Sequence, residues 1–200
     1  MKYDTLELDV MSDSPYLDED ELARVNSFLQ GIFDADKQLG RLADFVESRD
    51  TPTIIVFFGD HLPILGLHTD MIFEQLSWIS NQAGYLWDLH DRTRIFQTPY
   101  LVWANYDLGQ EDWGALSTYM LAARVAEASG INMNRYFTYL LGLAGHFRGI
   151  TNELYIDIHG EFHPSRDNRN NPHILALEAL WYAKFFGDDE MRDSLAEILE

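Results

Sequence analysis

The chain has 200 residues, with 33 acidic side chains against 14 lysines and arginines, which gives a formal net charge of −19. Hydrophobic residues make up 46% of it, which is enough to build a globular core and argues against disorder. The excess of acid excludes nucleic acid and anionic membrane surfaces as partners, because both are bound through clustered basic side chains. The absence of cysteine excludes disulfides, thiolate metal sites and cysteine nucleophiles.

The first half of the chain predicts strands on either side of one long helix. Residues 6–11 alternate between apolar and acidic, which predicts a half-exposed strand. Asp18 and Glu21 are spaced as a capping box, and apolar residues then recur every three or four positions as far as Val46, which predicts the helix. The uncharged, β-branched residues 53–58 are typical of a strand buried on both faces in a parallel sheet.

The rest of the chain is expected to be richer in helix. Along the chain we expect a helix at 71–78, a strand at 100–105, helices at 112–129 and 134–148, a strand at 153–159, a polar loop at 160–172, and helices at 174–186 and 189–199. The predicted fold class is therefore α/β, with a mostly parallel central sheet flanked by helices and an α-helical C-terminal tail.

A chemically informative motif, Gly59-Asp60-His61, follows the buried strand directly. Ligands of open parallel sheets bind beyond the carboxyl ends of the strands, so Asp60 and His61 would lie at that edge, and Gly59 would leave the site unobstructed. A carboxylate oxygen and an imidazole nitrogen suit Mn²⁺, Zn²⁺ or a similar divalent cation better than a soft metal. The alternative is a surface or capping role, because a two-residue motif occurs often by chance.

Four segments together resemble a known family. They include the Gly-Asp-His-Leu-Pro motif and resemble the C-terminal part of the sulfatase-like alkaline phosphatase superfamily, and within it the lipoteichoic acid synthase and phosphoglycerol transferase branch. The segments are residues 32–42, 53–68, 98–105 and 154–160. The resemblance implies that residues 1–160 form the C-terminal portion of a sulfatase-like α/β domain, followed by a polar loop and closing helices at 161–200.

The resemblance also implies roles for individual residues. Asp60 and His61 would be two ligands of a divalent metal, Mn or alternatively Zn, Mg or Ca. His68 and Asp13 would bind an anionic phosphate or sulfate ester, although a loop hydrogen bond is the alternative for His68. In the family, the remaining acidic ligand and the Thr or Ser nucleophile lie earlier in the chain, and no nucleophile is identifiable here.

Three functional hypotheses follow. In the first, the chain holds the metal-ligand half of a metal-dependent phosphoglycerol transferase or of a sulfatase- or phosphodiesterase-type hydrolase. In the second, it is a non-catalytic fragment or a degenerate binding or structural module. In the third, it is a self-contained metallohydrolase that adds the 159–163 segment to Asp60, His61 and His68. The spacing of His159, Glu161 and His163 puts all three on one face of a strand, where they could hold a second metal.

The same resemblance bears on location and assembly. The transferase branch is anchored by N-terminal membrane helices, which implies the extracytoplasmic face of the cell membrane and an anchor outside these residues. The chain as given has no apolar run long enough to span a bilayer and is expected to be soluble. A fragment that lacks strands of its sheet would expose an apolar edge, so we also expect self-association.

Overall fold

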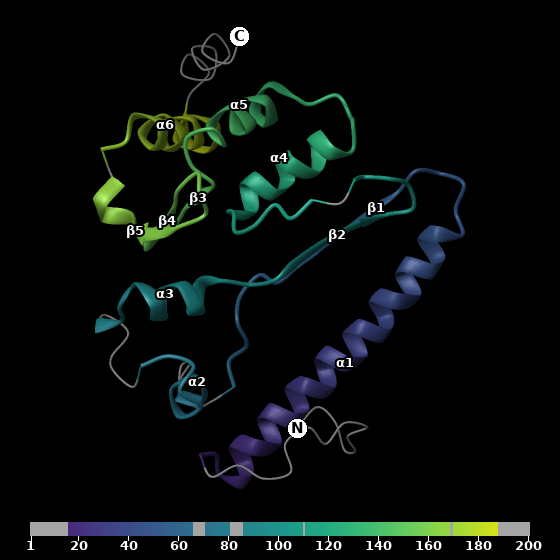
Figure 1. Cartoon of the computed structure of the whole chain (residues 1–200), viewed down its shortest axis with the longest axis vertical. Helices are drawn as coiled ribbons and strands as arrows, with labels where there is room; N and C mark the ends of the chain where they lie inside the picture. Colours follow the sequence, from purple (N-terminus) through teal and green to yellow (C-terminus); the bar gives the residue numbers. More distant parts are fainter. Residues whose placement is uncertain (1–15, 66–70, 81–85, 110, 169, 188–200) are drawn as a thin grey trace. The chain divides into compact units, whose positions relative to one another are not determined.

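The computed structural model describes residues 16–65, 71–80, 86–109, 111–168 and 170–187 (Figure 1). The chain forms two compact units, Met1–Asp107 and Leu108–Glu200, and each is described by itself. Four predictions lie outside the described residues: the strand at 6–11, the helix at 189–199, and the site residues Asp13 and His68.

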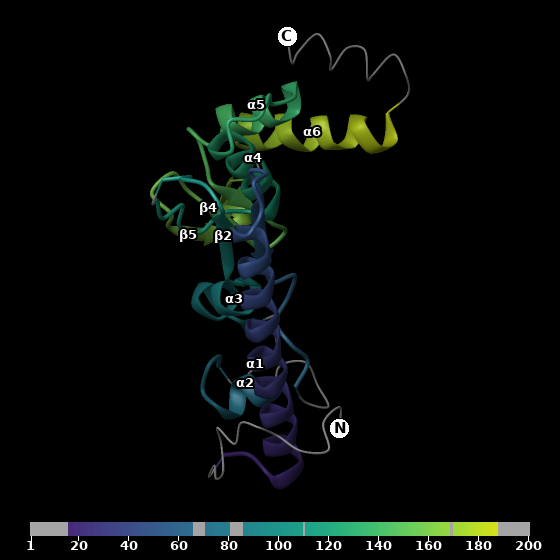
Figure 2. The same cartoon turned by 90° about the vertical axis from the view of Figure 1, so that its right-hand side faces the viewer.

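The first unit begins with the long predicted helix, α1, which spans Glu19–Glu47. Its capping box is present, because the Asp18 carboxylate accepts the amide of Glu21 at 2.8 Å and the Glu21 carboxylate accepts the amide of Asp18 at 3.0 Å. Figures 1 and 2 show α1 as one uninterrupted rod, so neither Gly31 nor Gly40 breaks it. The prediction of one long helix is confirmed.

Two predicted strands pair with each other, and they run antiparallel. β1 (Ile54–Phe58) and β2 (Tyr100–Ala104) form an antiparallel pair in which Val56 faces Val102. The mixed α/β class is confirmed, but a mostly parallel sheet is not found among the described strands, all of which pair antiparallel. The prediction that this strand is buried on both faces is wrong in the structure, because Ile55 is buried whereas Val56, Phe57 and Phe58 are exposed. An uncharged β-branched run also carries no information on the direction of the neighbouring strand.

Between these strands the chain forms two short helices, α2 (Met71–Gln75) and α3 (Leu89–Phe96). The buried side chains of Leu17, Val25 and Ile72 pack together, so α2 lies against the N-terminal half of α1. The Gln75 side chain donates to the Glu21 carboxylate at 3.1 Å, which adds a polar link between the same two helices.

Asn105, directly after β2, joins three segments through its side chain. Its Nδ2 group donates to the carbonyls of Val46, Arg49 and Thr51 at 3.0–3.1 Å, and its Oδ1 atom accepts the amide of Thr53 at 2.8 Å. The C-terminus of α1 and the start of β1 are therefore held to the end of β2. This network fixes where β1 begins, and hence where the residues that follow it lie.

The second unit packs helices on a small antiparallel sheet, with strand order β3-β4-β5. Its buried core is shared by the helices and the sheet, and it includes Leu140, Phe147, Tyr155 and Ile174. Figures 1 and 2 show α5 and α6 side by side, in agreement with that shared core. The elements are α4 (Thr118–Ala128), α5 (Arg135–Leu143), β3 (Gly149–Ile150), β4 (Leu154–Ile156), β5 (Phe162–Pro164), a 3-10 turn (Ser165–Asn168) and α6 (Pro172–Phe186).

Several boundaries in this unit differ from the prediction, since α5 ends at Leu143 rather than at 148 and β4 covers Leu154–Ile156 rather than 153–159. α4 begins at Thr118 rather than near residue 112, because the Asp112 carboxylate accepts the amide of Gly114 at 2.8 Å and folds that stretch into a turn. The segment predicted as a polar loop at 160–172 instead contains β5 and the 3-10 turn. Over all the described residues, each helix is too short or too polar to cross a lipid bilayer.

Candidate functional site

The Asp60-His61 pair directly follows Gly59, which hydrogen bonds hold in place at the end of β1. The amide of Gly59 donates to the carbonyl of Pro99 at 3.1 Å, and the Thr98 hydroxyl donates to the carbonyl of Gly59 at 2.7 Å. These two hydrogen bonds continue the β1–β2 pairing by one residue. The loop that carries Asp60 and His61 therefore leaves the sheet in a defined direction.

Gly59 is required at this point by close packing. A Cβ atom built on Gly59 would lie 2.9 Å from the Cβ atom of Thr98, closer than real Cβ contacts allow. From the sequence, we expected this glycine to leave the metal site unobstructed. In the structure, the absence of a Cβ atom at Gly59 instead allows the Thr98 side chain to pack against its backbone.

Asp60 and His61 lie next to each other and face solvent. The Oδ1 atom of Asp60 accepts the amide of His61 at 2.9 Å, which orients the carboxylate. The Oδ2 atom of Asp60 then lies 3.5 Å from the Nε2 atom of His61, with side chains that are 82% and 72% exposed. The two predicted ligands are thus brought together at an open surface.

The ring of His61 is held by its other nitrogen. Nδ1 lies 2.8 Å from the carbonyl oxygen of Leu62, and since a carbonyl only accepts hydrogen bonds, Nδ1 carries the proton. In the neutral ring, the lone pair of Nε2 then faces the Oδ2 atom of Asp60. A metal cation placed beside both atoms would accept a lone pair from each of them.

The pair fits the divalent cation that the family resemblance implies. Nitrogen and oxygen ligands at about 2.0–2.2 Å from such an ion lie roughly 3–3.5 Å from each other. The 3.5 Å separation of Asp60 and His61 matches that range. Two ligands leave at least two positions of a four-coordinate site for other groups.

Asp157, Glu161 and His163 gather in the second unit, and sequence analysis found this group only in part. Their ligand atoms all lie within 4.8 Å of one another. The sequence grouped His159 with Glu161 and His163, whereas in the structure His159 gives only its backbone amide, to the Asp157 carboxylate at 2.8 Å. The missed signal is cross-strand pairing: β4 and β5 form a hairpin, and Asp157 directly follows β4, across the hairpin from Glu161 and His163.

The carboxylate of Asp157 is strongly stabilised in its charged form. The hydrogen bond with the His163 ring, followed by the one from the amide of Glu161, lowers the pKa of Asp157 from 3.8 to about 2. The group of three therefore contains a carboxylate that stays ionised in mild acid. Among the described residues this is the one group of three potential ligands, and it includes neither Asp60 nor His61.

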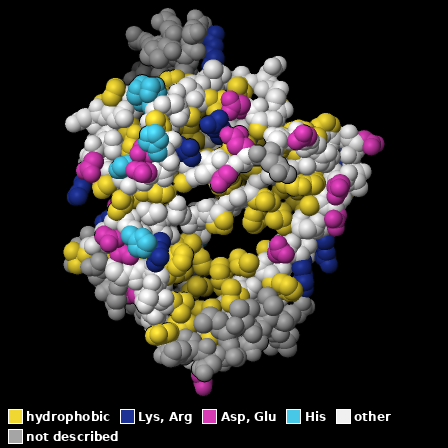
Figure 3. Space-filling view, in the orientation of Figure 1, with side chains coloured by type: hydrophobic (Ala, Val, Ile, Leu, Met, Phe, Trp, Pro, Cys, Tyr) yellow, Lys and Arg dark blue, Asp and Glu magenta, His cyan; other side chains and the backbone are white. Residues whose placement is uncertain are grey.

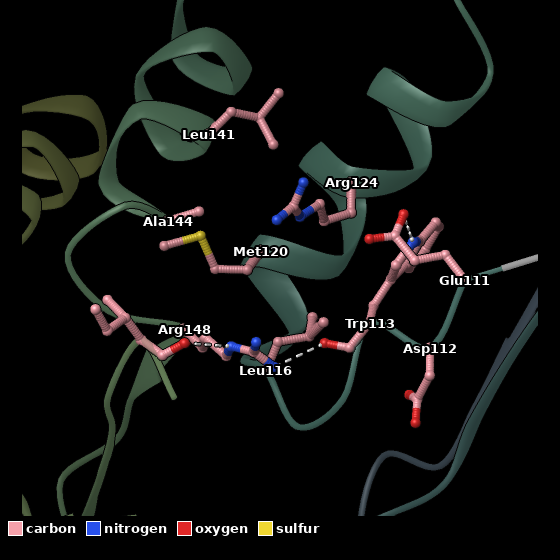
Figure 4. Close-up of a pocket in the computed structure, with 10 residues that line it drawn as sticks. Glu111, Asp112, Trp113, Leu116, Met120, Arg124, Leu141, Ala144 and Arg148 are labelled. Carbon is pink, nitrogen blue, oxygen red and sulfur yellow. Dashed lines mark hydrogen bonds between the residues drawn. The ribbon is translucent and has the colours of Figure 1, made fainter. Parts of the chain in front are cut away.

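The second unit also contains a small cavity of about 120 Å³ (Figure 4). Its lining is mixed, with Met120 and Arg124 from α4, Leu141 from α5, and Arg148. Arg148 is engaged with backbone carbonyls, donating to Trp113 at 3.3 Å and to Ile158 at 3.2 Å, and Arg124 pairs with Glu127 at 2.8 Å. None of the site residues predicted from the sequence lines this cavity.

Comparisons with known proteins give a family and a distant relative. The model of the Sulfatase family matches residues 7–145. A protein of Rhizobium meliloti (strain 1021), whose name proposes a role in cyclic beta-1,2-glucan modification, is 28% identical over 153 residues. The match covers 76% of this chain and 23% of the relative, so the chain spans about a quarter of that protein's length. No solved structure matches the chain at a significant level.

Proposed function

This chain belongs to the sulfatase family, and from that premise we propose that its Asp60 and His61 ligate a divalent cation in an enzyme that acts on an anionic ester. The observation that carries the proposal is the geometry of the pair. With Nδ1 of His61 committed to the Leu62 carbonyl, Nε2 faces the Asp60 carboxylate at 3.5 Å, and a cation satisfies both acceptors.

The proposed cation would locally compensate the negative charge of the chain. A sulfate or phosphate ester is repelled by a protein with a net charge of −19 unless a positive charge lies at the site. When bound, a divalent cation supplies that charge and polarises a phosphoryl or sulfuryl oxygen. We propose Mn²⁺ as the metal, with Zn²⁺, Mg²⁺ or Ca²⁺ as the alternatives.

The residues of this chain position the ligands and leave the substrate side open. Gly59 and Thr98 fix the start of the loop, the His61 amide orients Asp60, and the Leu62 carbonyl sets the tautomer of His61. The exposure of both ligand side chains leaves room for an ester oxygen and for further protein ligands. We propose that the hydroxyl nucleophile and another acidic ligand come from residues other than those of this chain, and that Asp13 and His68 contact the ester.

We further propose phosphoglycerol transfer as the reaction of the whole protein. The named role of the relative is the modification of a glucan, and a sugar hydroxyl would then take the place of water as the acceptor. Hydrolysis of a sulfate or phosphate ester is the simpler alternative. In the whole protein, residues 1–160 would complete a mostly parallel sheet with strands from elsewhere, and an anchor would hold it at the outer face of the cell membrane.

The experiment uses the protein at its natural length with Mn²⁺ and two chromogenic substrates, 4-nitrophenyl sulfate and bis(4-nitrophenyl) phosphate. Asp60→Asn and His61→Gln should each lower kcat/KM by more than about 100-fold. Removing a residue that only hydrogen-bonds to a metal ligand already lowers activity, and removing the ligand itself should lower it at least as much. Asp50→Asn removes the same charge from an exposed position before β1 and should leave the rate unchanged. Full activity in the Asp60→Asn variant would refute the proposal.

A further inference from the structure

The hairpin formed by β4 and β5 places four chemically active side chains on one face. Tyr155 pairs with His163 and Ile156 with Phe162 across the hairpin, and just beyond these pairs the amide of Asp157 donates to the carbonyl of Glu161 at 3.0 Å. Side chains of directly opposite residues in an antiparallel pair point to the same face. The pairing of β4 with β5 therefore brings Asp157 and Glu161, at the two ends of the connecting loop, close to His163.

The distances within this group suit a metal ion. The Nε2 atom of His163 lies 3.0 Å from the Oδ2 atom of Asp157, and the third ligand atom, from Glu161, lies within 4.8 Å of both. Ligand atoms around an ion at about 2.0–2.2 Å lie roughly 3–4.4 Å apart, depending on whether they are adjacent or opposite. Small rotations of the Glu161 side chain would bring all three into that range.

The charges of the group also call for a cation. The Asp157 and Glu161 carboxylates lie across the hairpin from each other, and like charges in that position repel unless a cation lies between them. The imidazole of His163 distinguishes this group from an ordinary acidic surface cluster, since it adds a nitrogen donor to two oxygen donors. That mixed donor set is typical of sites for Zn²⁺ and similar borderline cations. Figure 3 shows histidine and acidic side chains side by side on the visible face.

Supporting hydrogen bonds hold the first ligand in place. The Oδ1 atom of Asp157 accepts the amides of His159 and Glu161 at 2.8 and 2.9 Å, which leaves Oδ2 to face His163. Gly160, with a φ of 84°, makes the turn that allows both bonds, and Arg148 anchors the loop by donating to the carbonyl of Ile158 at 3.2 Å. Such backbone support around a ligand is what fixes its orientation in metal sites.

We propose that Asp157, Glu161 and His163 form a site for a divalent transition-metal cation of the Zn²⁺ type at the tip of the β4–β5 hairpin. Three protein ligands leave a fourth position open to water or to a ligand atom of a partner. The bound ion would bridge the two strands and stabilise the hairpin, because it binds the folded arrangement and not the unfolded chain. This proposal does not depend on Asp60 and His61.

The test is a titration of the full chain with ZnCl₂ by calorimetry, in a background that carries Asp60→Asn and His61→Gln. We expect one ion per chain. His163→Gln and Glu161→Gln should each weaken binding at least about tenfold, as expected for the loss of a ligand. His159→Gln, in the same loop but outside the group, should change the affinity by less than about twofold.

Spectroscopic measurements distinguish the loss of a metal ligand from a folding defect of the variant. In the unmodified chain, the ring ¹⁵N resonances of His163 should shift on addition of Zn²⁺, and the Co²⁺ complex should show the visible absorption of a nitrogen- and oxygen-ligated ion. Circular dichroism should show that the His163→Gln chain is folded. Unchanged Zn²⁺ affinity in folded His163→Gln, equal weakening in His159→Gln, or no shift of the His163 ring would each overturn the proposal.

Discussion

Gly59 and Asp60 show how single residues prepare the site. The Asp-His pair and its place directly after a strand could be predicted from the sequence, because both depend only on neighbouring residues. The tautomer of His61 and the packing of Gly59 could not, since they depend on the Leu62 carbonyl and on Thr98, which is 39 residues away along the chain. Asp157 was missed for the same reason, because its partners lie across a hairpin.

The close approach of Gly59 and Thr98 makes a sharp prediction. Gly59→Ala would place a Cβ atom 2.9 Å from that of Thr98 and should destabilise the protein by about 1–3 kcal/mol through overpacking. Gly40→Ala, in α1 with nothing within 4 Å of the new atom, should instead stabilise it by about 0.5–1 kcal/mol. Urea unfolding measures both, and equal effects would show that the packing at Gly59 is looser than described.

The hydrogen bonds of Asp157 predict its titration. Because the pKa in the folded protein, about 2, lies below the ordinary value of 3.8, the contribution of this carboxylate to stability is full above pH 3.8 and is lost as the pH falls toward 2. ¹³C NMR of the carboxyl group should give a midpoint near pH 2, and His163→Gln should raise it. A midpoint at the ordinary value in the unmodified chain would contradict the observed geometry.

At the scale of helices and strands, the sequence predicted best those elements whose pattern extends over many neighbouring residues. α1 has a capping box and a sustained apolar period, so its 29 residues could be predicted with both ends. α3, which has eight residues and is mostly polar, offers too few turns for a periodicity to be visible. The antiparallel direction of β1 and β2 is decided by tertiary pairing, which apolar composition does not encode.

Asn105 gives the prediction that belongs to this scale. Asn105→Asp replaces the Nδ2 donor with a carboxylate oxygen that faces the carbonyls of Val46, Arg49 and Thr51. We expect a loss of about 1–3 kcal/mol, because these acceptors lose their donor and meet a negative charge. Gln97→Ala, an exposed amide just before β2, should stay within about 0.5 kcal/mol. Thermal unfolding distinguishes the two, and similar stabilities would show that the network is dispensable.

At the scale of the whole molecule, the β1–β2 pair leaves apolar side chains at the surface. Val56, Phe57, Phe58 and Leu101 are each between 37% and 47% exposed, and Figure 3 shows hydrophobic side chains gathered on the visible face. Composition could predict a globular, acidic chain. It could not predict which apolar residues stay uncovered, since that depends on how many strands the sheet contains.

These exposed strands predict self-association of the chain. Among the described strands, β1 and β2 each have one edge without a neighbour, and such edges next to exposed apolar side chains favour pairing with a second chain. Light scattering coupled to size-exclusion chromatography should show a mass that rises with concentration, and Phe57→Ser with Phe58→Ser should reduce that rise. A monomer at all concentrations tested would indicate that the two strands need no partner.

The most direct test of the central claim is paramagnetic line broadening by Mn²⁺ in the amide NMR spectrum of the full chain. The method detects weak binding, as expected for two ligands, and reports on distance from the ion. We predict that the amides of Gly59, Asp60, His61 and Leu62 broaden first within their unit, and that Asp60→Asn with His61→Gln abolishes this effect without changing the rest of the spectrum. Unbroadened amides around Asp60 at millimolar Mn²⁺, or the same broadening in the double variant, would contradict the assignment of these two residues as metal ligands.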